Sequence, residues 1–214
     1  MGVEKERFVE MRLSEIISNG KYRDETELIF FHGTATKWLH SFTSNGIGIV
    51  KLNKKKDFGQ GFYLTTRYWQ AKDYADRVAN ATSTEPLIIS CIIPLGHLRE
   101  DQKKGLIIDQ FDEKWLETII KGRFYPEEPL ANEYDWIYGR CGDGKTPVFE
   151  KKFSKEQENP DLKTLLPHII PSKDFPHYEY DQLWLGTKKA ISIIKSVEFI
   201  SKEGVSYEKI PLHQ

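Results

Sequence analysis

The sequence predicts an α+β fold in a single domain, on three observations. The chain has 214 residues, a length that suits one domain. Short apolar runs of the strand type are mixed with longer segments of helical periodicity. These segments do not alternate regularly as βαβ units would, which disfavours a doubly wound parallel sheet. Hydrophobic residues make up 39% of the chain and aromatic residues 13%, which is enough for a sizeable core.

Five segments have the pattern of a helix. Apolar residues between Val9 and Ile17 recur at helical spacing, and Asn19-Gly20 ends this first helix. Thr66 is placed to cap the third helix through its side chain. The predicted helices cover residues 9–17, 36–42, 66–79, 112–121 and 190–194.

Six apolar runs bounded by turn residues have the pattern of a strand. The strongest is Leu87 to Ile93, which Pro94 closes. The predicted strands cover residues 28–31, 61–65, 87–93, 136–138, 182–185 and 197–200.

Polar segments divide the chain. Residues 51–57, KLNKKKD, predict a polar loop, and the charged stretch 150–162 predicts a solvated loop or insertion. We therefore expect an N-terminal helix within 1–25, one domain over 26–205 and a tail over 206–214.

Charge and apolar content exclude two classes of protein. The formal net charge is −1, so the chain as a whole has no attraction for nucleic acid or anionic membranes, although a local basic patch stays open. No apolar stretch approaches the roughly 20 residues that span a bilayer, and the charged N-terminus lacks a signal core. We expect a cytoplasmic protein with no membrane partner.

The cysteines and histidines predict no metal site. Cys91 and Cys141 lack metal-type spacing and are expected to be reduced thiols, with a single disulfide as the alternative. The six histidines also lack the spacing of metal ligands.

The familiar nucleotide motifs are absent from the sequence. Gly59-Gln60-Gly61 begins like a dinucleotide fingerprint, but Leu64 stands at the third glycine position and the preceding segment is lysine-rich. There is no Walker sequence, and no serine lies in a nucleophile elbow.

Three short motifs remain. A strand ends in His-Gly-Thr at 32–34, Phe-Gly-Gln-Gly-Phe-Tyr occupies 58–63, and Tyr-Asp-Gln-Leu-Trp occupies 180–184. Together they resemble the ADP-ribosyltransferase superfamily, in the histidine-tyrosine-glutamate branch that includes poly(ADP-ribose) polymerases and diphtheria toxin. The stretch DQLWLGTKKA at 181–190 is similar to a bacterial subgroup with an Asp-Gln third motif. The resemblance extends over roughly residues 28–200, and it implies an ADP-ribosyltransferase-like split β-sheet flanked by helices.

The resemblance implies roles for the first two motifs. NAD+ would be the substrate, and no metal would be needed. His32 would hydrogen-bond the adenosine ribose, and the backbone of Gly33, next to Thr34, would bind the nicotinamide amide. Tyr63 would stack on the nicotinamide ring, which suits an electron-rich phenol against a cationic ring. Gly59 and Gly61 would let the chain turn before that tyrosine, with Gly61 at the cofactor site.

The third motif departs from the family pattern. Gln182 stands where glutamate usually holds the nicotinamide ribose. An amide can accept a hydrogen bond from the ribose but supplies no negative charge and no general base. The missing charge would cost on the order of 2–4 kcal/mol of transition-state stabilisation. Asp181 is the second candidate catalytic residue. If both residues lie within the strand, period-2 geometry directs Asp181 to the face opposite Gln182. If the motif lies at the very end of the strand, Asp181 or Glu179 could reach the site.

Three functions follow from these patterns. The first is a mono-ADP-ribosyltransferase with a protein, DNA or RNA acceptor. Family members of this bacterial type are often toxins, effectors or phage-defence components. The resemblance therefore also implies an antitoxin or immunity protein as partner. The second is a non-catalytic NAD- or nucleotide-binding module. The third is an RNA 2′-phosphotransferase, although Arg67, Arg77 and Arg140 do not form an evident phosphate-binding set.

Overall fold

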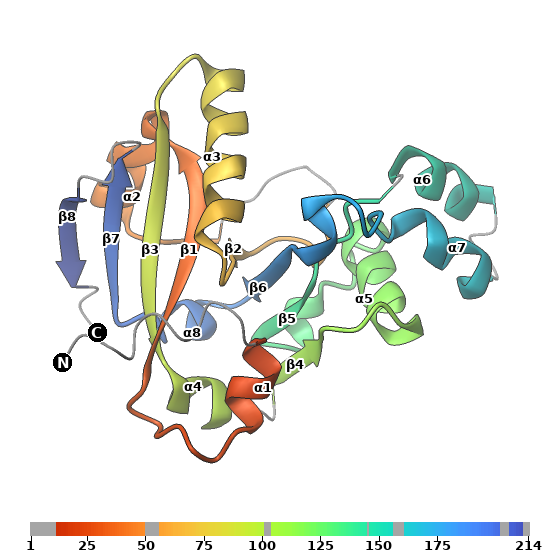
Figure 1. The fold of residues 1–214 in the computed structure, drawn as a ribbon, viewed down its shortest axis with the longest axis horizontal. Coiled ribbons are helices and arrows are strands. Elements are labelled where there is room, and N and C mark those ends of the chain that lie inside the picture. The colour runs from red at the N-terminus through yellow and green to blue at the C-terminus, as the bar shows by residue number, and fades with distance from the viewer. Residues whose placement is uncertain are drawn as a thin grey trace.

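Two four-stranded sheets lie side by side and form the centre of the protein (Figure 1). The computed structural model describes residues 12–49, 56–100, 104–144, 146–155, 161–201 and 206–211. Over these residues the protein contains both helices and strands. One βαβ unit, in which parallel strands at 105–108 and 136–140 are joined through the helix 113–124, stands among otherwise antiparallel pairs, so the predicted α+β class is confirmed.

The first sheet is antiparallel throughout and has the order β1-β3-β7-β8. β3 is almost entirely buried, since one side packs on helix α3 and the other side faces the main core. Its strands are β1 (Glu27–Ala35), β3 (Pro86–Pro94), β7 (Ser196–Ser201) and β8 (Ser206–Pro211). The long helix α3 (Tyr68–Thr82) covers β1 and β3.

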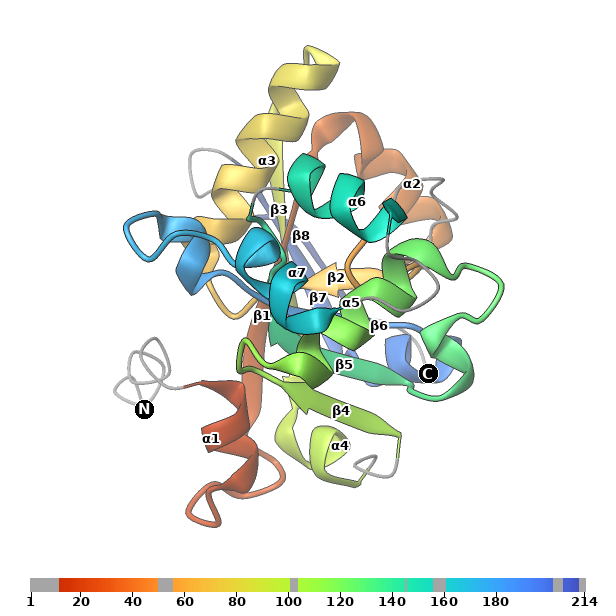
Figure 2. The ribbon, with the colours of Figure 1, turned by 90° about the vertical axis from the view of Figure 1, so that its right-hand side faces the viewer.

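The second sheet has the order β2-β6-β5-β4, in which β4 and β5 are parallel and the other pairs are antiparallel. Its strands are β2 (Phe62–Leu64), β6 (Asp181–Leu185), β5 (Trp136–Arg140) and β4 (Gly105–Ile108). Three helices gather beside it, on the side that faces the viewer in Figure 2. They are α5 (Glu113–Phe124), α6 (Thr146–Lys155) and α7 (Leu162–Ile169).

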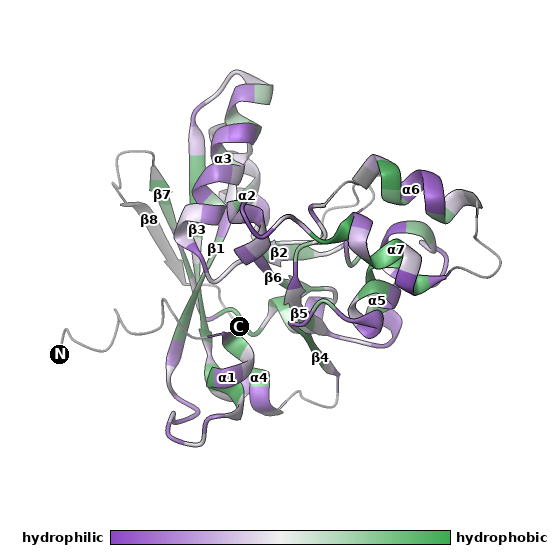
Figure 3. Ribbon diagram, turned by 45° about the vertical axis from the view of Figure 1, so that its right-hand side comes forward, coloured by the Kyte–Doolittle hydropathy of each residue, from purple (hydrophilic) through white to green (hydrophobic). Residues whose placement is uncertain are grey.

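Shorter helices close the ends of the sheets. They are α1 (Leu13–Ser18), α2 (Leu39–Asn45), α4 (Leu95–Glu100) and α8 (Lys188–Ile191), with 3₁₀ turns at Thr36–Trp38, Leu130–Asn132 and Pro176–Glu179. In Figure 3 much of β3 and β7 is hydrophobic, whereas α3 shows many hydrophilic residues. No helix in the described part of the chain is both long and apolar enough to cross a bilayer.

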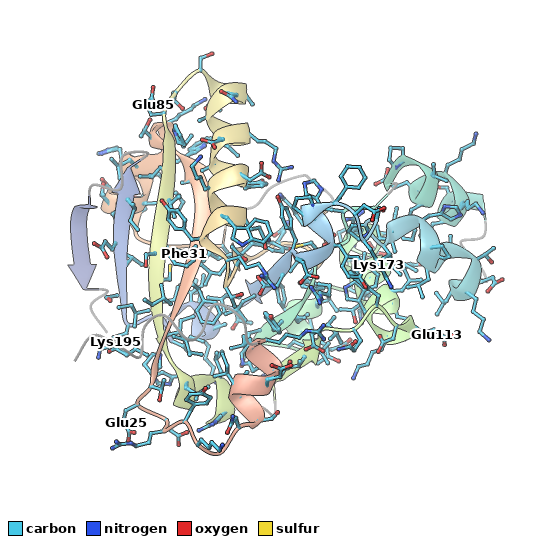
Figure 4. The ribbon with its side chains drawn as sticks, viewed as in Figure 1. Glu25, Phe31, Glu85, Glu113, Lys173 and Lys195 are labelled. Carbon is cyan, nitrogen blue, oxygen red and sulfur yellow. The ribbon has the colours of Figure 1, made fainter. Side chains whose placement is uncertain are left out.

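The two sheets meet at one bridge. The N–H of Phe31 on β1 donates to the carbonyl of Thr65, and the N–H of Thr65 donates back to the carbonyl of Phe31, both at 2.8 Å. Figure 4 labels Phe31 about midway along β1. Beyond this pair the backbones of β1 and β2 form no further bridge in the described residues, although side chains of both sheets pack in one hydrophobic core.

Two segment predictions were wrong. Residues 150–155 of the predicted loop 150–162 are helical, because α6 extends to Lys155 and buries Phe149 and Phe153 against α5 and α7. Residues 206–211 do not form a tail, because β8 pairs with β7 as a fourth strand.

The predicted cap of α3 was also wrong. The capping position is Arg67, one residue later than predicted, and it makes no side-chain cap bond. The hydroxyl of Thr66 instead donates to the carboxylate of Asp181. Residues 9–11 of the first predicted helix and residues 51–55 of the predicted polar loop lie outside the described residues.

Candidate functional site

The candidate site lies where β1 and β2 separate. Nδ1 of His32, the first residue after the bridge on β1, is 2.7 Å from the carbonyl oxygen of Tyr63. A carbonyl only accepts, so Nδ1 carries the proton and Nε2 carries the free lone pair. The structure therefore brings the first two predicted motifs into direct contact.

His32 is held neutral at physiological pH. Burial lowers the pKa of the imidazole to about 4; the Tyr63 carbonyl opposes this shift, and the charge of Lys56 adds to it. The ring packs against Phe62, with centroids 4.6 Å apart, and against Phe42 at 6.0 Å. The neutral tautomer leaves Nε2 as a hydrogen-bond acceptor, which is the property needed to bind a hydroxyl group.

Among the described residues, no group pairs with the backbone of Gly33 on the side that faces β2. Alternate residues of an antiparallel strand direct their backbone groups to the same side. Since Phe31 directs its groups toward Thr65, Gly33 directs its N–H and C=O to that side as well. Continued pairing would join Gly33 to Tyr63, but His32 already occupies the Tyr63 carbonyl.

Gly33 is a glycine for a different reason from the one the sequence suggested. A Cβ there would lie 2.0 Å from the carbonyl oxygen of Ala71 and 2.9 Å from the nitrogen of Ala75, both in α3. The clearance is thus needed by the helix and not by a ligand. Thr34 is buried two residues beyond His32, on the same face of β1.

The backbone of the segment 57–61 holds the hydroxyl group of Tyr63. The Tyr63 hydroxyl donates to the carbonyl of Gly59 at 2.7 Å and accepts from the N–H of Phe58 at 3.1 Å. Gly59 has a φ of 77°, a left-handed conformation that favours glycine. Burial raises the pKa of Tyr63 well above its ordinary value, and the charge of Asp57 adds to this shift. The phenol is neutral and its ring is fixed in direction.

Gly61 is required by a neighbour in the second sheet. A Cβ at this position would lie 2.0 Å from Nε1 of Trp184. The Trp184 indole is buried and donates to the carbonyl of Gln60 at 3.0 Å. Gly61 therefore allows tight packing between the loop and β6.

Gln182 lies on the same face of β6 as Trp184, which pairs with Tyr63 across the β2–β6 ladder. The Gln182 side chain is 7% exposed. Its Nε2 donates to Oδ2 of Asp57 at 2.7 Å and to the carbonyl of Arg140 at 3.1 Å. Within the described residues its Oε1 accepts no hydrogen bond, and it is not among the fully buried unpaired polar atoms. The amide oxygen therefore remains available to a ligand.

Asp57 is the site residue that the sequence analysis missed. It was assigned to a polar loop, yet it is 7% exposed and forms a buried ion pair with Arg123, whose Nε lies 2.9 Å from Oδ1. The N–H of Gly142 donates to Oδ2 at 2.7 Å. The indication in the sequence that Asp57 is buried was weak: it is the only acidic residue in KLNKKKD, and it directly precedes the buried Phe58.

Asp181 points to the opposite face from Gln182, as period-2 geometry predicted. Its carboxylate is buried and accepts from the hydroxyls of Thr65, Thr66 and Tyr138 and from the N–H of Thr66. These bonds join the end of β2 to β5 and β6. The geometry makes Asp181 a structural anchor of the site and does not place its carboxylate beside Gln182.

The comparison with protein families gives one match. The sequence profile of a family described as protein of unknown function (DUF3990) matches residues 28–196. The chain belongs to this DUF3990 family. The matched range contains all three motifs and Asp57, Arg123 and Gly142. No curated protein matches the chain.

Both cysteines of this DUF3990 protein are free and buried, so the predicted disulfide alternative is wrong. Cys141 lies beside the site, where its thiol contacts the side chain of Gln70 and the carbonyl of Asp181. Burial raises the pKa of Cys141 well above its ordinary value, and the charges of Asp143 and Asp57 add to the shift. This thiol is therefore unsuited to act as a nucleophile.

The arginines of the phosphotransferase alternative are engaged elsewhere. Arg67 and Arg140 both approach Glu179, at 3.4 and 3.6 Å, and Arg77 pairs with Asp73 at 3.1 Å. Each cation already faces a carboxylate, so the three do not form a free phosphate-binding cluster. Among the described residues there is also no group of three or more acidic, histidine or cysteine side chains that could hold a metal.

Proposed function

We propose that this DUF3990 protein is a mono-ADP-ribosyltransferase with an ADP-ribosyltransferase-like split sheet. It would cleave NAD+ at the nicotinamide bond and pass ADP-ribose to a macromolecular acceptor. The observation that carries the proposal is the hydrogen bond from His32 to the Tyr63 carbonyl. This bond joins two of the three motifs that resemble the ADP-ribosyltransferase superfamily, at the point where the sheets diverge. The pairing of β2 with β6 brings Gln182 to the same place.

The open edge at Gly33 suits the nicotinamide carboxamide. A carboxamide has one acceptor and two donors, which matches the N–H and C=O that Gly33 directs into the split. Tyr63 lies across the split, and its ring is fixed by the two hydrogen bonds of its hydroxyl. A fixed phenol ring beside this edge can stack on the nicotinamide without losing side-chain freedom on binding.

The two riboses would be held by His32 and Gln182. The unprotonated Nε2 of His32 would accept from a hydroxyl of the adenosine ribose. Oε1 of Gln182 would accept from a hydroxyl of the nicotinamide ribose and orient it as the glycosidic bond breaks. The step is SN1-like: nicotinamide leaves with the bonding electron pair, and a nucleophile of the acceptor then attacks the oxocarbenium carbon and loses a proton.

The second function is a non-catalytic NAD-binding module of the same fold. The observation that favours it is Gln182 itself, because a neutral amide supplies no full charge to the oxocarbenium ion. The proposal for the catalytic function includes a role in the cytoplasm as a toxin, effector or phage-defence component. It also includes an antitoxin or immunity protein as partner, and protein, DNA or RNA as the acceptor.

The test is NAD+ turnover by purified protein. NAD+ labelled in the adenylate is incubated with and without cell lysate, and wild type is compared with Tyr63→Ala and Gln182→Ala. Label transferred to protein or nucleic acid, and lost in both variants, supports a transferase and identifies the acceptor class. Binding without turnover favours the module, and absence of binding contradicts both functions.

A further inference from the structure

We propose that Asp57 is a positioning residue that fixes the Gln182 amide and provides the buried negative charge behind it. The inference rests on the proposed function and concerns the same site. It addresses the departure from the family pattern, in which a neutral glutamine stands where a carboxylate is usual. In this protein the carboxylate is present, one hydrogen bond farther from the ligand.

The orientation of the Gln182 amide follows from its two donors. A side-chain amide has two N–H groups and one acceptor oxygen. One N–H is used by Asp57 at 2.7 Å and the other by the Arg140 carbonyl at 3.1 Å. A flipped amide would place its oxygen against these two acceptors, and both contacts would become repulsive. Oε1 is therefore the atom that faces the ligand, and the side chain does not need to reorient on binding.

The charge of Asp57 acts through that amide. A hydrogen bond to a carboxylate is stronger than a neutral one, and it polarises the amide so that the far oxygen becomes more negative. Arg123 on α5 pairs with Asp57. The negative charge of Asp57 also contributes to the raised pKa of Tyr63, Cys141 and Asp143, which lie around it. The Gln182 oxygen thus becomes a better acceptor for the ribose hydroxyl as positive charge develops on the sugar.

A purely structural role for Asp57 is the competing explanation. Asp57 also holds the N–H of Gly142 and the guanidinium of Arg123, so its removal would loosen the loop after β5. Loss of activity in one variant would not separate the two roles. Exchanging the amide and the carboxylate between the two positions does separate them.

Three variants make this test. In Asp57→Asn the NH2 group of the new amide faces N–H donors that the carboxylate accepted from, and the Gln182 amide is no longer held in one orientation. We therefore expect kcat for NAD+ cleavage to fall about tenfold or more, with a smaller change in KM. In the exchange variant Asp57→Asn/Gln182→Glu the amide of residue 57 donates to a carboxylate at residue 182. The acceptor oxygen and the net charge are kept, but the Arg140 carbonyl and the Gly142 N–H each lose a hydrogen-bond partner, so kcat should rise well above that of Asp57→Asn without exceeding the wild-type value.

The third variant, Gln182→Glu, gives a pH signature and does not require that Asp57→Asn folds. Two carboxyl groups at hydrogen-bond distance share one proton. While that proton is bound, the acid at position 182 donates to Asp57 as the amide does, and its other oxygen faces the ligand. When the pH rises and the proton leaves, the carboxylates repel each other. We expect kcat of Gln182→Glu to fall with rising pH, whereas wild type and the exchange variant do not show this fall.

The outcomes separate the two proposals. Thermal melting is measured for each variant so that rates are compared per folded molecule. If wild type does not cleave NAD+, the proposed function fails and the inference fails with it. If wild type cleaves NAD+ but Asp57→Asn is equally fast, or the exchange variant folds without recovering kcat, or Gln182→Glu follows the wild-type pH profile, only the inference is overturned.

Discussion

His32 separates the two sheets by taking the carbonyl oxygen of Tyr63, at 2.7 Å from its Nδ1. The bridge between Phe31 and Thr65 shows that β1 and β2 are in register for further pairing. A regular ladder would next join Gly33 to Tyr63. The imidazole replaces that pairing, so one side chain both ends the ladder and leaves the Gly33 edge open.

The buried imidazole predicts acid sensitivity. The pKa of His32 is lowered to about 4 from 6.5. Below pH 6.5 the unfolded chain binds a proton that the folded protein does not, so stability falls as the pH drops from about 6.5 to about 4. The loss attributable to His32 reaches about 3 kcal/mol. Urea unfolding is measured from pH 4 to 7 for wild type and His32→Asn, whose amide keeps a donor for Tyr63. Wild type should lose more stability than the variant; equal pH slopes would contradict the prediction.

Gly33 should tolerate no side chain. In Gly33→Ala the new Cβ would lie 2.0 Å from the Ala71 carbonyl, and α3 would have to move away from β1. Overpacking of this kind costs about 1–3 kcal/mol, and the melting temperature should fall accordingly. Gly48→Ala is the matched control, because a Cβ there meets nothing within 4 Å. Equal melting temperatures for the two variants would show that α3 shifts without cost.

Asp181 should matter for folding more than for chemistry. Its carboxylate accepts from Thr65, Thr66 and Tyr138, and Asp181→Asn places amide hydrogens against these donors. We expect the free energy of unfolding to fall by about 2–4 kcal/mol, with NAD+ cleavage per folded molecule nearly unchanged. Asp76→Asn is the control, since the Asp76 carboxylate is exposed and pairs with Lys72 on the surface of α3. A stable Asp181→Asn variant with abolished cleavage would instead support a catalytic role.

The sequence predicted the strands of the site well because their patterns are local. The predicted strands 28–31 and 182–185 fall within β1 and β6, although β1 continues to Ala35. Gly59 lies in the predicted turn and has a left-handed conformation there. Period-2 geometry also placed Asp181 and Gln182 on opposite faces. These features depend on neighbouring residues alone.

The features that sequence did not predict depend on distant partners. Asp57 and Gln182 are 125 residues apart, and nothing near Asp57 indicates that Arg123 will bury it. Gly33 was interpreted as a nicotinamide-binding residue and Gly61 as a turn residue at the cofactor site, but a Cβ at these positions would meet α3 and Trp184, respectively. Thr66 is drawn from its expected capping role by Asp181. Each difference arises from a contact that only the tertiary fold creates.

Helix α6 gives a final prediction, because its residues 150–155 belong to the segment that was expected to be a solvated loop or insertion. Phe153 is 1% exposed and packs on Phe124 of α5, with ring centroids 4.4 Å apart. Phe153→Ala would remove a buried aromatic ring and should cost about 3–5 kcal/mol. Val148→Ala on the same helix is the control: Val148 is 41% exposed, and its truncation should change stability by about 0.5 kcal/mol or less. Chemical unfolding measures both variants. Equal, small effects would mean that α6 does not pack on the domain, whereas a large loss for Phe153→Ala alone shows that the charged segment is part of the core.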